Sequence, residues 1–395
     1  MLRILLASSS VGLGHIVRDR VLVYALSNLG FDVEVLCSEP ALSYAKHWGL
    51  KIHSVSHSIE SLSKIYSEYY LSKEYGGFSL GFISRVNNVV NMNKNRILEE
   101  VVIDDYDAII ADESWELMKI FAERPALYSG IHKILITDFL FFKPTSIAEI
   151  PSSILLNIFL RKSYRVFDTK LYVGLKNTTA SRYGFIDIGL LPSVLKGEML
   201  SKNDARNILK LGDKYSILFS IGGTSGGIDM LEIIIRSIEI VGRELKDLDS
   251  FSLTIAPGSE YNRTLVEKIL DKLSPSIDIA ILEDMYSLPK VVKAFDIIIS
   301  PAGLGIISLM ISSGVPGIIF PLKKHFEQEE NARIAPKLWE GIRSLEKHPI
   351  DEKKLASLLK IMLKTNPGAP PDIYKNVEKT VNLIKTRVPN HAGDI

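Results

Sequence analysis

The chain has 395 residues, of which 46% are hydrophobic and 24% charged, a composition typical of globular proteins and a length sufficient for two domains. Its 47 basic and 46 acidic residues leave a formal net charge of +1, so no overall field favours nucleic acid as a partner. The single cysteine, Cys37, excludes an internal disulfide and with it the class of disulfide-stapled secreted domains.

Neither a metal motif nor a membrane-spanning segment is evident in the sequence. CxxC and HExxH spacings do not occur, so we expect no metal site and no bound cofactor. The apolar run after Met1 is short and predicts a first strand rather than a signal peptide, and no run of about 18 uncharged apolar residues is present. We therefore expect a cytoplasmic protein.

Short apolar runs alternate with helical patterns in the first half of the chain. Because these runs are nearly continuous, they predict strands of a parallel sheet that is buried on both faces. The predicted strands are Arg3–Ala7, Asp32–Cys37, Lys51–Ser54, Ala108–Ala111 and Lys133–Thr137. The predicted helices are Ile16–Leu29 and Ala41–Trp48.

The second half of the chain repeats this alternation. Its predicted strands are Ser216–Ser220, Ser252–Ala256, Ile277–Leu282, Asp296–Ser300 and Gly317–Phe320. The helical patterns between and after them are Ile228–Val241, Leu265–Lys272, Leu288–Ala294, Gly305–Ser312 and Glu329–Leu338. Two such series predict an α/β protein with two doubly wound, Rossmann-like domains that face a cleft.

Domain boundaries follow from composition. Residues 1–190 are expected to form the first domain and residues 213–370 the second. Residues 191–212 form the predicted linker, although part of it has a helical pattern. Residues 371–395 are expected to add a C-terminal helix and a tail that packs back on the first domain.

Each predicted domain contains a glycine-rich turn between a strand and a helix. The first turn contains Gly12 and Gly14, and the second contains Gly222 and Gly223. A strand that ends in glycines and leads into a helix leaves backbone N–H groups free at the helix N-terminus. Those groups favour an anion such as a diphosphate.

Polar side chains follow three of the predicted strands in the first domain. His15 ends the first glycine-rich turn, Asp112 and Glu113 follow Ala108–Ala111, and Asp138 follows Lys133–Thr137. An imidazole with an unperturbed pKa of about 6.5 can take a proton at neutral pH. Nearby carboxylates can orient that imidazole or bind hydroxyl groups, while helix capping and loop solvation are the alternative roles.

The second domain contains the most specific pattern. Four segments follow one another there: Ile281–Met285, Asp296–Gly305, Gly314–Pro321 and His325–Ala332. Their order resembles the nucleotide-sugar half of the GT-B glycosyltransferases. The likeness is to the lipid-linked N-acetylglucosaminyltransferases of peptidoglycan synthesis and related UDP-glycosyltransferases. The GLGH-x-x-R turn, which ends at Arg18, also resembles the N-terminal turn of archaeal and bacterial members of that superfamily.

This resemblance implies roles for individual residues. His15 would be the catalytic base, with Asp112 and Glu113 as its catalytic partners. Residues that would bind the acceptor are Gly12, Gly14 and Asp138. Residues that would bind the donor are Gly222, Gly223, Thr224, Met285, Ala302, Gly303, Leu304, Gly305, His325, Glu327, Gln328 and Asn331.

The chain departs from the family pattern at three positions. Members of the family usually have His where this chain has Pro301, Thr where it has Ile306, and a ribose-binding acid where it has Leu309. A leucine cannot accept a hydrogen bond from a ribose hydroxyl. The donor nucleotide would therefore be held by backbone groups and other residues, or the site has lost its affinity for nucleotide sugars.

The resemblance implies an inverting, metal-independent glycosyltransferase that moves a sugar from a UDP-sugar co-substrate to an acceptor hydroxyl. Residues 1–190 would bind the acceptor and residues 213–370 the nucleotide sugar. Two alternatives remain open. One is a nucleotide-sugar 2-epimerase on the same fold, and the other is a non-catalytic glycosyltransferase-like partner protein, which the three departures favour.

Two segments of the first domain suggest a peripheral membrane surface. Phe139–Lys143 and Ile154–Lys162 combine apolar and basic side chains, as surfaces that touch anionic lipid do. Further aromatic residues that fit this surface are Tyr66, Tyr69, Tyr70 and Phe78. The alternative is a buried helix with one polar edge. The expected partners are a nucleotide sugar, a lipid-linked or small-molecule acceptor and the inner face of a membrane, but not nucleic acid.

Overall fold

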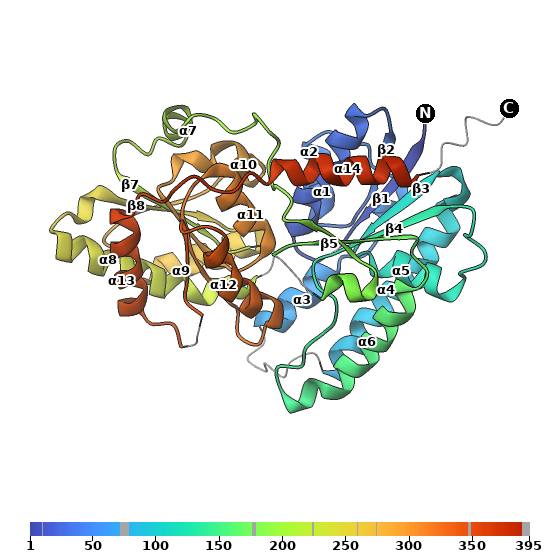
Figure 1. Ribbon diagram of the computed structural model, residues 1–395. Helices are drawn as coiled ribbons and strands as arrows, with labels where there is room; N and C mark the ends of the chain where they lie inside the picture. Colours follow the sequence, from blue (N-terminus) through green and yellow to red (C-terminus); the bar gives the residue numbers. More distant parts are fainter. Residues whose placement is uncertain are drawn as a thin grey trace. The chain divides into compact units, whose positions relative to one another are not determined.

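The protein is described by a computed structural model that covers residues 1–9, 11–71, 79–175, 179–222, 225–258, 260–273, 275–346 and 349–388. Its contacts divide the chain into two compact units. The first consists of Met1–Leu191 together with Tyr374–Ile395, and the second of Pro192–Ile373. Each unit has its own parallel sheet with helices packed around it (Figure 1).

In the described residues, the sheet of the first unit has six strands in the order β2-β1-β3-β4-β5-β6, and all neighbours are parallel. Every residue of β3 is buried, as expected for a strand covered on both faces. The strands are β1 (Arg3–Ser8), β2 (Asp32–Leu36), β3 (Ala108–Asp112), β4 (His132–Thr137), β5 (Thr169–Val173) and β6 (Ile186–Gly189).

Seven helices accompany this sheet within the described residues. The last of them, α14, comes from the far end of the chain and packs against α1 and β6 (red in Figure 1). Two serines, Ser79 and Ser114, cap α4 and α5 by accepting a hydrogen bond from a first-turn amide. The helices are α1 (Gly14–Asn28), α2 (Ala41–His47), α3 (Leu62–Leu71), α4 (Leu80–Glu100), α5 (Trp115–Glu123), α6 (Ile150–Tyr164) and α14 (Tyr374–Arg387).

The described part of the second unit also has a sheet of six parallel strands, in the order β12-β11-β10-β7-β8-β9. Its strands are β7 (Tyr215–Ser220), β8 (Phe251–Ala256), β9 (Asp278–Ile281), β10 (Ile297–Pro301), β11 (Gly317–Phe320) and β12 (Ile342–Ser344). Its helices are α7 (Lys202–Leu209), α8 (Leu231–Leu245), α9 (Glu260–Leu273), α10 (Leu288–Val291), α11 (Leu304–Ser313), α12 (Phe326–Leu338) and α13 (Glu352–Lys364).

Both sheets reverse their strand order beside the first strand of the unit. In the first unit the chain continues from β1 to β2 on one side and later returns to β3 on the other. In the second unit β8 and β10 flank β7 in the same way. Ligands of doubly wound sheets bind at this switch point, outside the carboxyl ends of the strands. The topology alone therefore directs attention to the ends of β1 and β3 and of β7 and β10.

The predicted α/β class with two parallel, doubly wound sheets is confirmed. The predicted strand Lys51–Ser54 is wrong. Only Ile52 pairs with the sheet, through a single bridge to Val35. The side chain of His53 then accepts a hydrogen bond from the amide of Val55 and starts a 3-10 turn that ends the extended segment. Within the described residues no helix is both long and apolar enough to cross a bilayer.

Candidate active site

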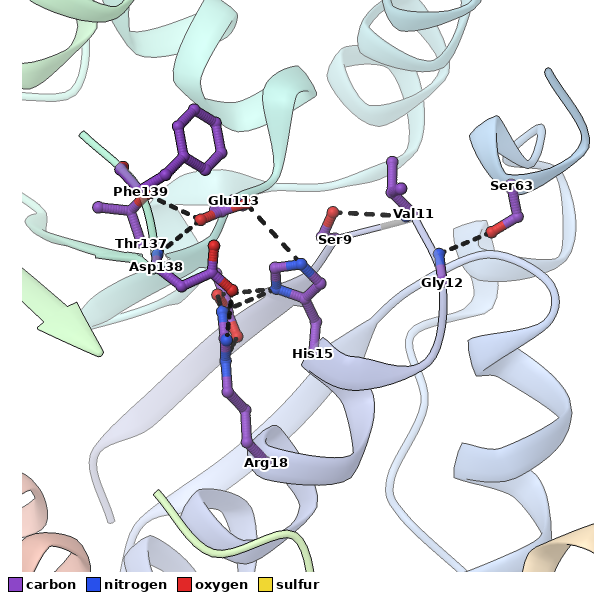
Figure 2. Close-up of polar contacts among 11 residues, drawn as sticks. Ser9, Val11, Gly12, His15, Arg18, Ser63, Glu113, Thr137, Asp138 and Phe139 are labelled. Atoms are coloured by element: carbon purple, nitrogen blue, oxygen red, sulfur yellow. Dashed lines mark hydrogen bonds and ion pairs between the residues drawn. The ribbon is translucent and has the colours of Figure 1, made fainter. Parts of the chain in front are cut away.

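The glycine-rich turn after β1 brings His15 to the carboxyl end of the first sheet. Gly12 has a φ of +71°, a left-handed conformation that glycine adopts without strain. Its N–H donates to the hydroxyl of Ser63 at 2.9 Å, which fixes the turn (Figure 2). Helix α1 begins at Gly14, so His15 lies in its first turn. The turn thus positions an imidazole whose side chain is 12% exposed.

Arg18 is the centre of a buried cluster of charged groups. It lies one turn after His15, and its guanidinium reaches the ends of two strands (Figure 2). Its Nε and Nη2 donate to the two oxygens of Asp112 at 2.7 and 2.5 Å, a bidentate pair, and its Nη1 donates to Asp138 at 2.8 Å. Burial would lower the pKa of Arg18, but the charges of Asp112 and Asp138 raise it well above its usual value. Arg18 therefore stays charged.

Asp112 is the last residue of β3 and pairs in the sheet with Ser8 of β1 and Ile136 of β4. Its side chain is fully buried. Burial opposes its ionisation, but Arg18 and then His15 hold the pKa of this carboxyl far below its usual value. Asp112 is therefore a carboxylate, able to accept hydrogen bonds from both neighbours.

The Nδ1 atom of His15 lies between two partners. It is 3.1 Å from Oδ1 of Asp112 and 2.8 Å from Nη2 of Arg18. A protonated Nδ1 donates to Asp112, and an unprotonated Nδ1 accepts from Arg18, so the two neighbours favour opposite tautomers. In the first case the lone pair of His15 is on Nε2, which faces Glu113 at 3.8 Å.

Glu113 follows β3 in a strained conformation. Its φ of +49° is uncommon for a residue with a side chain, and such strain is concentrated at functional sites. One carboxyl oxygen, Oε1, accepts from the amide of Asp138 at 2.7 Å and from the hydroxyl of Thr137 at 2.8 Å. Burial and then the charge of Asp138 raise the pKa of Glu113 well above its usual value. Burial and the neighbouring carboxylate therefore favour the protonated form of Glu113.

Glu113 lies beside Asp138, and Asp138 is a carboxylate. Burial opposes the ionisation of Asp138, but Arg18 lowers the pKa of its carboxyl, and a hydrogen bond with Glu113 adds to that effect. Asp19 and Asp112 form a second pair of acids, in which one pKa is raised and the other is lowered. Asp19 is fully buried, and burial followed by the charge of Asp112 raises its pKa well above the usual value.

The cluster combines lowered and raised pKa values within a few side chains. The pKa values of Asp112 and Asp138 are lowered, whereas those of Asp19 and Glu113 are raised. An imidazole whose Nδ1 lies beside an ionised carboxylate has the partner that orients a general base.

Ligand atoms of His15, Glu113 and Asp138 also lie within 4.8 Å of one another, close enough to hold a metal ion. A metal would have to displace the proton of Glu113 and compete with the ion pair between Arg18 and Asp138. The charges already present therefore favour a proton-binding site over a metal site.

In the second unit, the candidate donor site lies where β10 ends and α11 begins. Gly303 is the N-cap of α11 and provides no side-chain cap. The first intrahelical bond runs from the amide of Ile307 to Gly303, so the amides of Leu304 and Gly305 precede it. A Cβ added at Gly303 would meet no atom within 4 Å. This opening exposes the positive end of the helix dipole, which attracts anions.

The loop before α12 lies beside this helix start. Asn331 donates to the carbonyl of Ala302 at 3.0 Å, and Gln328 accepts from the amide of Leu322 at 3.0 Å. His325 is the N-cap of α12. These predicted donor residues therefore also maintain the local fold. Glu327 and Met285 are half-buried.

The remaining predicted donor residues are distributed around the same edge of the sheet. Gly222 follows β7 with a φ of +90°. Gly223 and Thr224 lie outside the described residues. Leu309, at the position where the family has an acid, is only 5% exposed, so a carboxylate there would lose its hydration.

Sequence reasoning brought His15, Asp112, Glu113 and Asp138 together but gave Arg18 no chemical role and overlooked Asp19. The available signal was their spacing. Positions 15, 18 and 19 lie on one face of a helix, because residues three and four apart are neighbours there. A charged pair on the face that carries the candidate base points toward the strand ends rather than toward solvent.

The raised pKa of Glu113 leads to a prediction about how stability depends on pH. A carboxyl with a higher pKa in the folded state binds more protons when folded, so its contribution to stability falls as pH rises above the unfolded value of about 4.3. Glu113→Gln removes this titration and keeps the shape of the side chain. We expect the free energy of unfolding of the variant to increase relative to the wild type between pH 4.5 and pH 9, as measured by urea denaturation.

The control for this measurement is Glu68→Gln, which changes an exposed side chain on α3. This substitution should leave the shape of the pH profile unchanged. Parallel profiles for Glu113→Gln and the wild type would contradict a neutral Glu113.

The comparisons with known proteins agree with this fold. Residues 217–386 match the family model for the C-terminal domain of glycosyltransferase family 28. MurG from Acinetobacter baumannii is 13% identical over 97% of this chain and 99% of its own, with a TM-score of 0.55. The spinosyn rhamnosyltransferase SpnG, solved with thymidine diphosphate, is 13% identical over 98% and 96% of the two chains, with a TM-score of 0.57.

A protein described as a UDP-N-acetylglucosamine 2-epimerase from Listeria monocytogenes has the same fold, with 11% identity over 98% and 96% of the two chains and a TM-score of 0.60. The search of curated proteins gave no match. Identities this low establish the fold, and the family match adds support for a glycosyltransferase. The chain thus has the GT-B fold, and its residues 217–386 match the C-terminal domain of glycosyltransferase family 28.

Proposed function

We propose that the protein is an inverting, metal-independent glycosyltransferase that moves a sugar from a UDP-sugar to an acceptor hydroxyl, with His15 as the general base. The observation that carries this proposal is the buried cluster in which Arg18 and Asp112 hold His15 at the switch point of the first sheet. The family match of the second unit supports a nucleotide-sugar donor.

In the proposed reaction, Asp112 accepts from Nδ1 of His15 and thereby leaves the lone pair on Nε2. Nε2 removes the proton of the acceptor hydroxyl, whose oxygen attacks the anomeric carbon of the donor sugar while the bond to the diphosphate breaks. The proton stays on His15, where Asp112 stabilises the imidazolium. Amides at the start of α11 would stabilise the charge that develops on the departing diphosphate.

Glu113 has a distinct role in this scheme. Its carboxyl and the Nε2 atom of His15 are 3.8 Å apart, so an acceptor oxygen to one side of the line that joins them can lie about 2.8 Å from each. Because Glu113 is neutral, it orients that oxygen without adding a negative charge that would oppose the developing alkoxide. The acceptor hydroxyl is thereby held beside the base.

A nucleotide-sugar 2-epimerase is the second candidate. The Listeria structure favours it by its fold, and the buried acids around His15 are groups that could exchange protons with a sugar. The two activities give different products. An epimerase converts the nucleotide sugar without an acceptor, whereas a transferase releases UDP when an acceptor is present.

The first test concerns the base. His15→Ala and Asp112→Asn should each lower turnover by about 10²- to 10⁴-fold, because the proton acceptor or its orientation is lost. The measurement is UDP release from a panel of UDP-hexoses with a membrane lipid extract as acceptor, and the remaining donor is analysed for its epimer.

The control is His132→Ala, which removes an imidazole at the opposite end of β4 that contacts Thr169 at 3.0 Å. Turnover of this variant should stay near that of the wild type. Near-normal turnover of His15→Ala would assign the base to another group, and formation of an epimer without acceptor would support the second candidate.

The second test concerns the donor site. Gly303→Val should weaken UDP binding at least about tenfold, because the branched side chain would occupy the space in front of the α11 amides. Stability should fall by less than about 1 kcal/mol, since the added Cβ meets no protein atom within 4 Å. Calorimetric titration with UDP measures the affinity, and thermal unfolding measures the stability.

Gly130→Val is the matched control, because a Cβ at Gly130 also meets no atom within 4 Å and the residue lies in the first unit. It should bind UDP as the wild type does. Equal affinities for Gly303→Val and the wild type would refute a phosphate site at the start of α11.

We further propose that the acceptor is linked to a lipid and that α6 rests on an anionic bilayer. Five aliphatic side chains at the start of α6 and along it are 43–86% exposed: Ile147, Ile150, Ile154, Leu155 and Ile158. Four of them recur every three or four residues and form one stripe. Arg161 and Lys162 follow in the last turn, where they can meet lipid phosphates.

The exposed surface differs from the one that the sequence suggested. Leu140 and Phe142 are buried, and Asn157 of α6 exchanges two hydrogen bonds with the backbone of Phe142. That part of the Phe139–Lys143 prediction is wrong, because the loop packs onto the inner side of α6. The side chains of Tyr69, Tyr70 and Phe78 lie outside the described residues.

The third test concerns this surface. Co-sedimentation with phosphatidylcholine vesicles should rise with their phosphatidylglycerol content and fall with salt. Ile154→Glu combined with Ile158→Glu should weaken binding at least about tenfold, because each isoleucine buries apolar surface worth on the order of 1 kcal/mol.

The control combines Ile208→Glu and Ile361→Glu. These substitutions replace two exposed isoleucines of the second unit and introduce the same charge as the test variant. It should sediment as the wild type does. A wild type that stays in the supernatant at low salt, or equal losses in both double variants, would contradict membrane contact through α6.

A further inference from the structure

Asp19 is a buried acid that the proposed reaction does not use. It follows Arg18 on α1 and lies one turn beyond His15, on the face that covers the ends of β1 and β3. Its side chain is fully buried, and neither carboxyl oxygen has a hydrogen-bond donor among the residues that the structure describes. An ionised carboxylate without donors is strongly disfavoured in such a place.

Among the described residues that face Asp19, no cation is available to pair with it. The guanidinium of Arg18 is directed to Asp112, Asp138 and His15. On the side of β2 lies Cys37, whose thiol is neutral, because burial and then Asp19 raise its pKa to about 12. Ser8 is the remaining polar neighbour, and its neutral hydroxyl cannot compensate a charge on Asp19.

Asp112 is the acceptor that can match a protonated Asp19. An ionised carboxylate offers about four lone-pair sites. Oδ1 of Asp112 contacts Nη2 of Arg18 and Nδ1 of His15. Oδ2 contacts Nε of Arg18. One site on Oδ2 is thus left for a further donor, and Asp112 raises the pKa of Asp19 through its charge and through side-chain hydrogen bonding.

We propose that Asp19 is a positioning residue, which carries a proton and donates it in a hydrogen bond to Asp112. This bond completes the set of donors around the carboxylate and fixes its orientation toward His15. The role in turnover rests on the proposed function, in which His15 is the base. The proton on Asp19 itself does not depend on that function and can be observed directly.

The direct experiment is infrared spectroscopy of the Glu113→Gln protein at pH 7.5. This substitution removes the other neutral acid of the cluster, so the carbonyl absorption of a protonated carboxyl should remain and should disappear when Asp19→Asn is added. Absence of that absorption in the Glu113→Gln protein at this pH would overturn the proposal, whether or not the protein transfers sugar.

The functional experiment compares two changes of similar size. Asp19→Asn keeps a donor toward Asp112 and should leave kcat within about threefold of the wild type. Asp19→Leu removes the donor and should lower kcat about 10- to 100-fold with little change in KM, as is common when a supporting hydrogen bond is lost. Urea denaturation identifies loss of fold in either variant. Equal kcat values for two folded variants would overturn the positioning role, because asparagine would then give no rescue.

Discussion

The bidentate pair between Arg18 and Asp112 is the interaction on which the rest of the candidate site depends. It joins α1 to the end of β3, and the same guanidinium reaches Asp138 after β4. Breaking a buried ion pair on one side leaves the other charge uncompensated, which typically destabilises a protein by about 3–5 kcal/mol. A single arginine thus holds three chain segments and keeps two carboxylates ionised in a buried place.

The parallel sheet explains why these groups meet. Strands β1, β3 and β4 are neighbours and run in the same direction, so the residues that follow them gather at one edge. The second unit repeats this topology with different chemistry. Its switch point presents glycines and the free amides of α11 instead of acids. The same topology therefore places charged side chains at the switch point of one unit and helix amides at that of the other.

Much of the fold could be predicted because the buried strands are nearly continuous apolar runs. Strands β5, β6 and β12 escaped detection, since they are short and contain polar residues such as Lys170 and Asp187. The ends of β3 and β4 located Asp112, Glu113 and Asp138, because position after a strand is visible in the sequence. Protonation states were not visible, because they depend on how Arg18 divides its hydrogen bonds among the acids.

The central claim is that Asp112 holds His15 with the proton on Nδ1 and the lone pair on Nε2. The most direct measurement is nitrogen NMR of the protein with its eight histidines labelled with ¹⁵N, where the signals of His15 are assigned by comparison with His15→Gln. We predict that the neutral form of the ring has a protonated Nδ1 and an unprotonated Nε2. A neutral ring with the proton on Nε2 would contradict the claim, since Nδ1 would then accept from Arg18 and no base would face the acceptor.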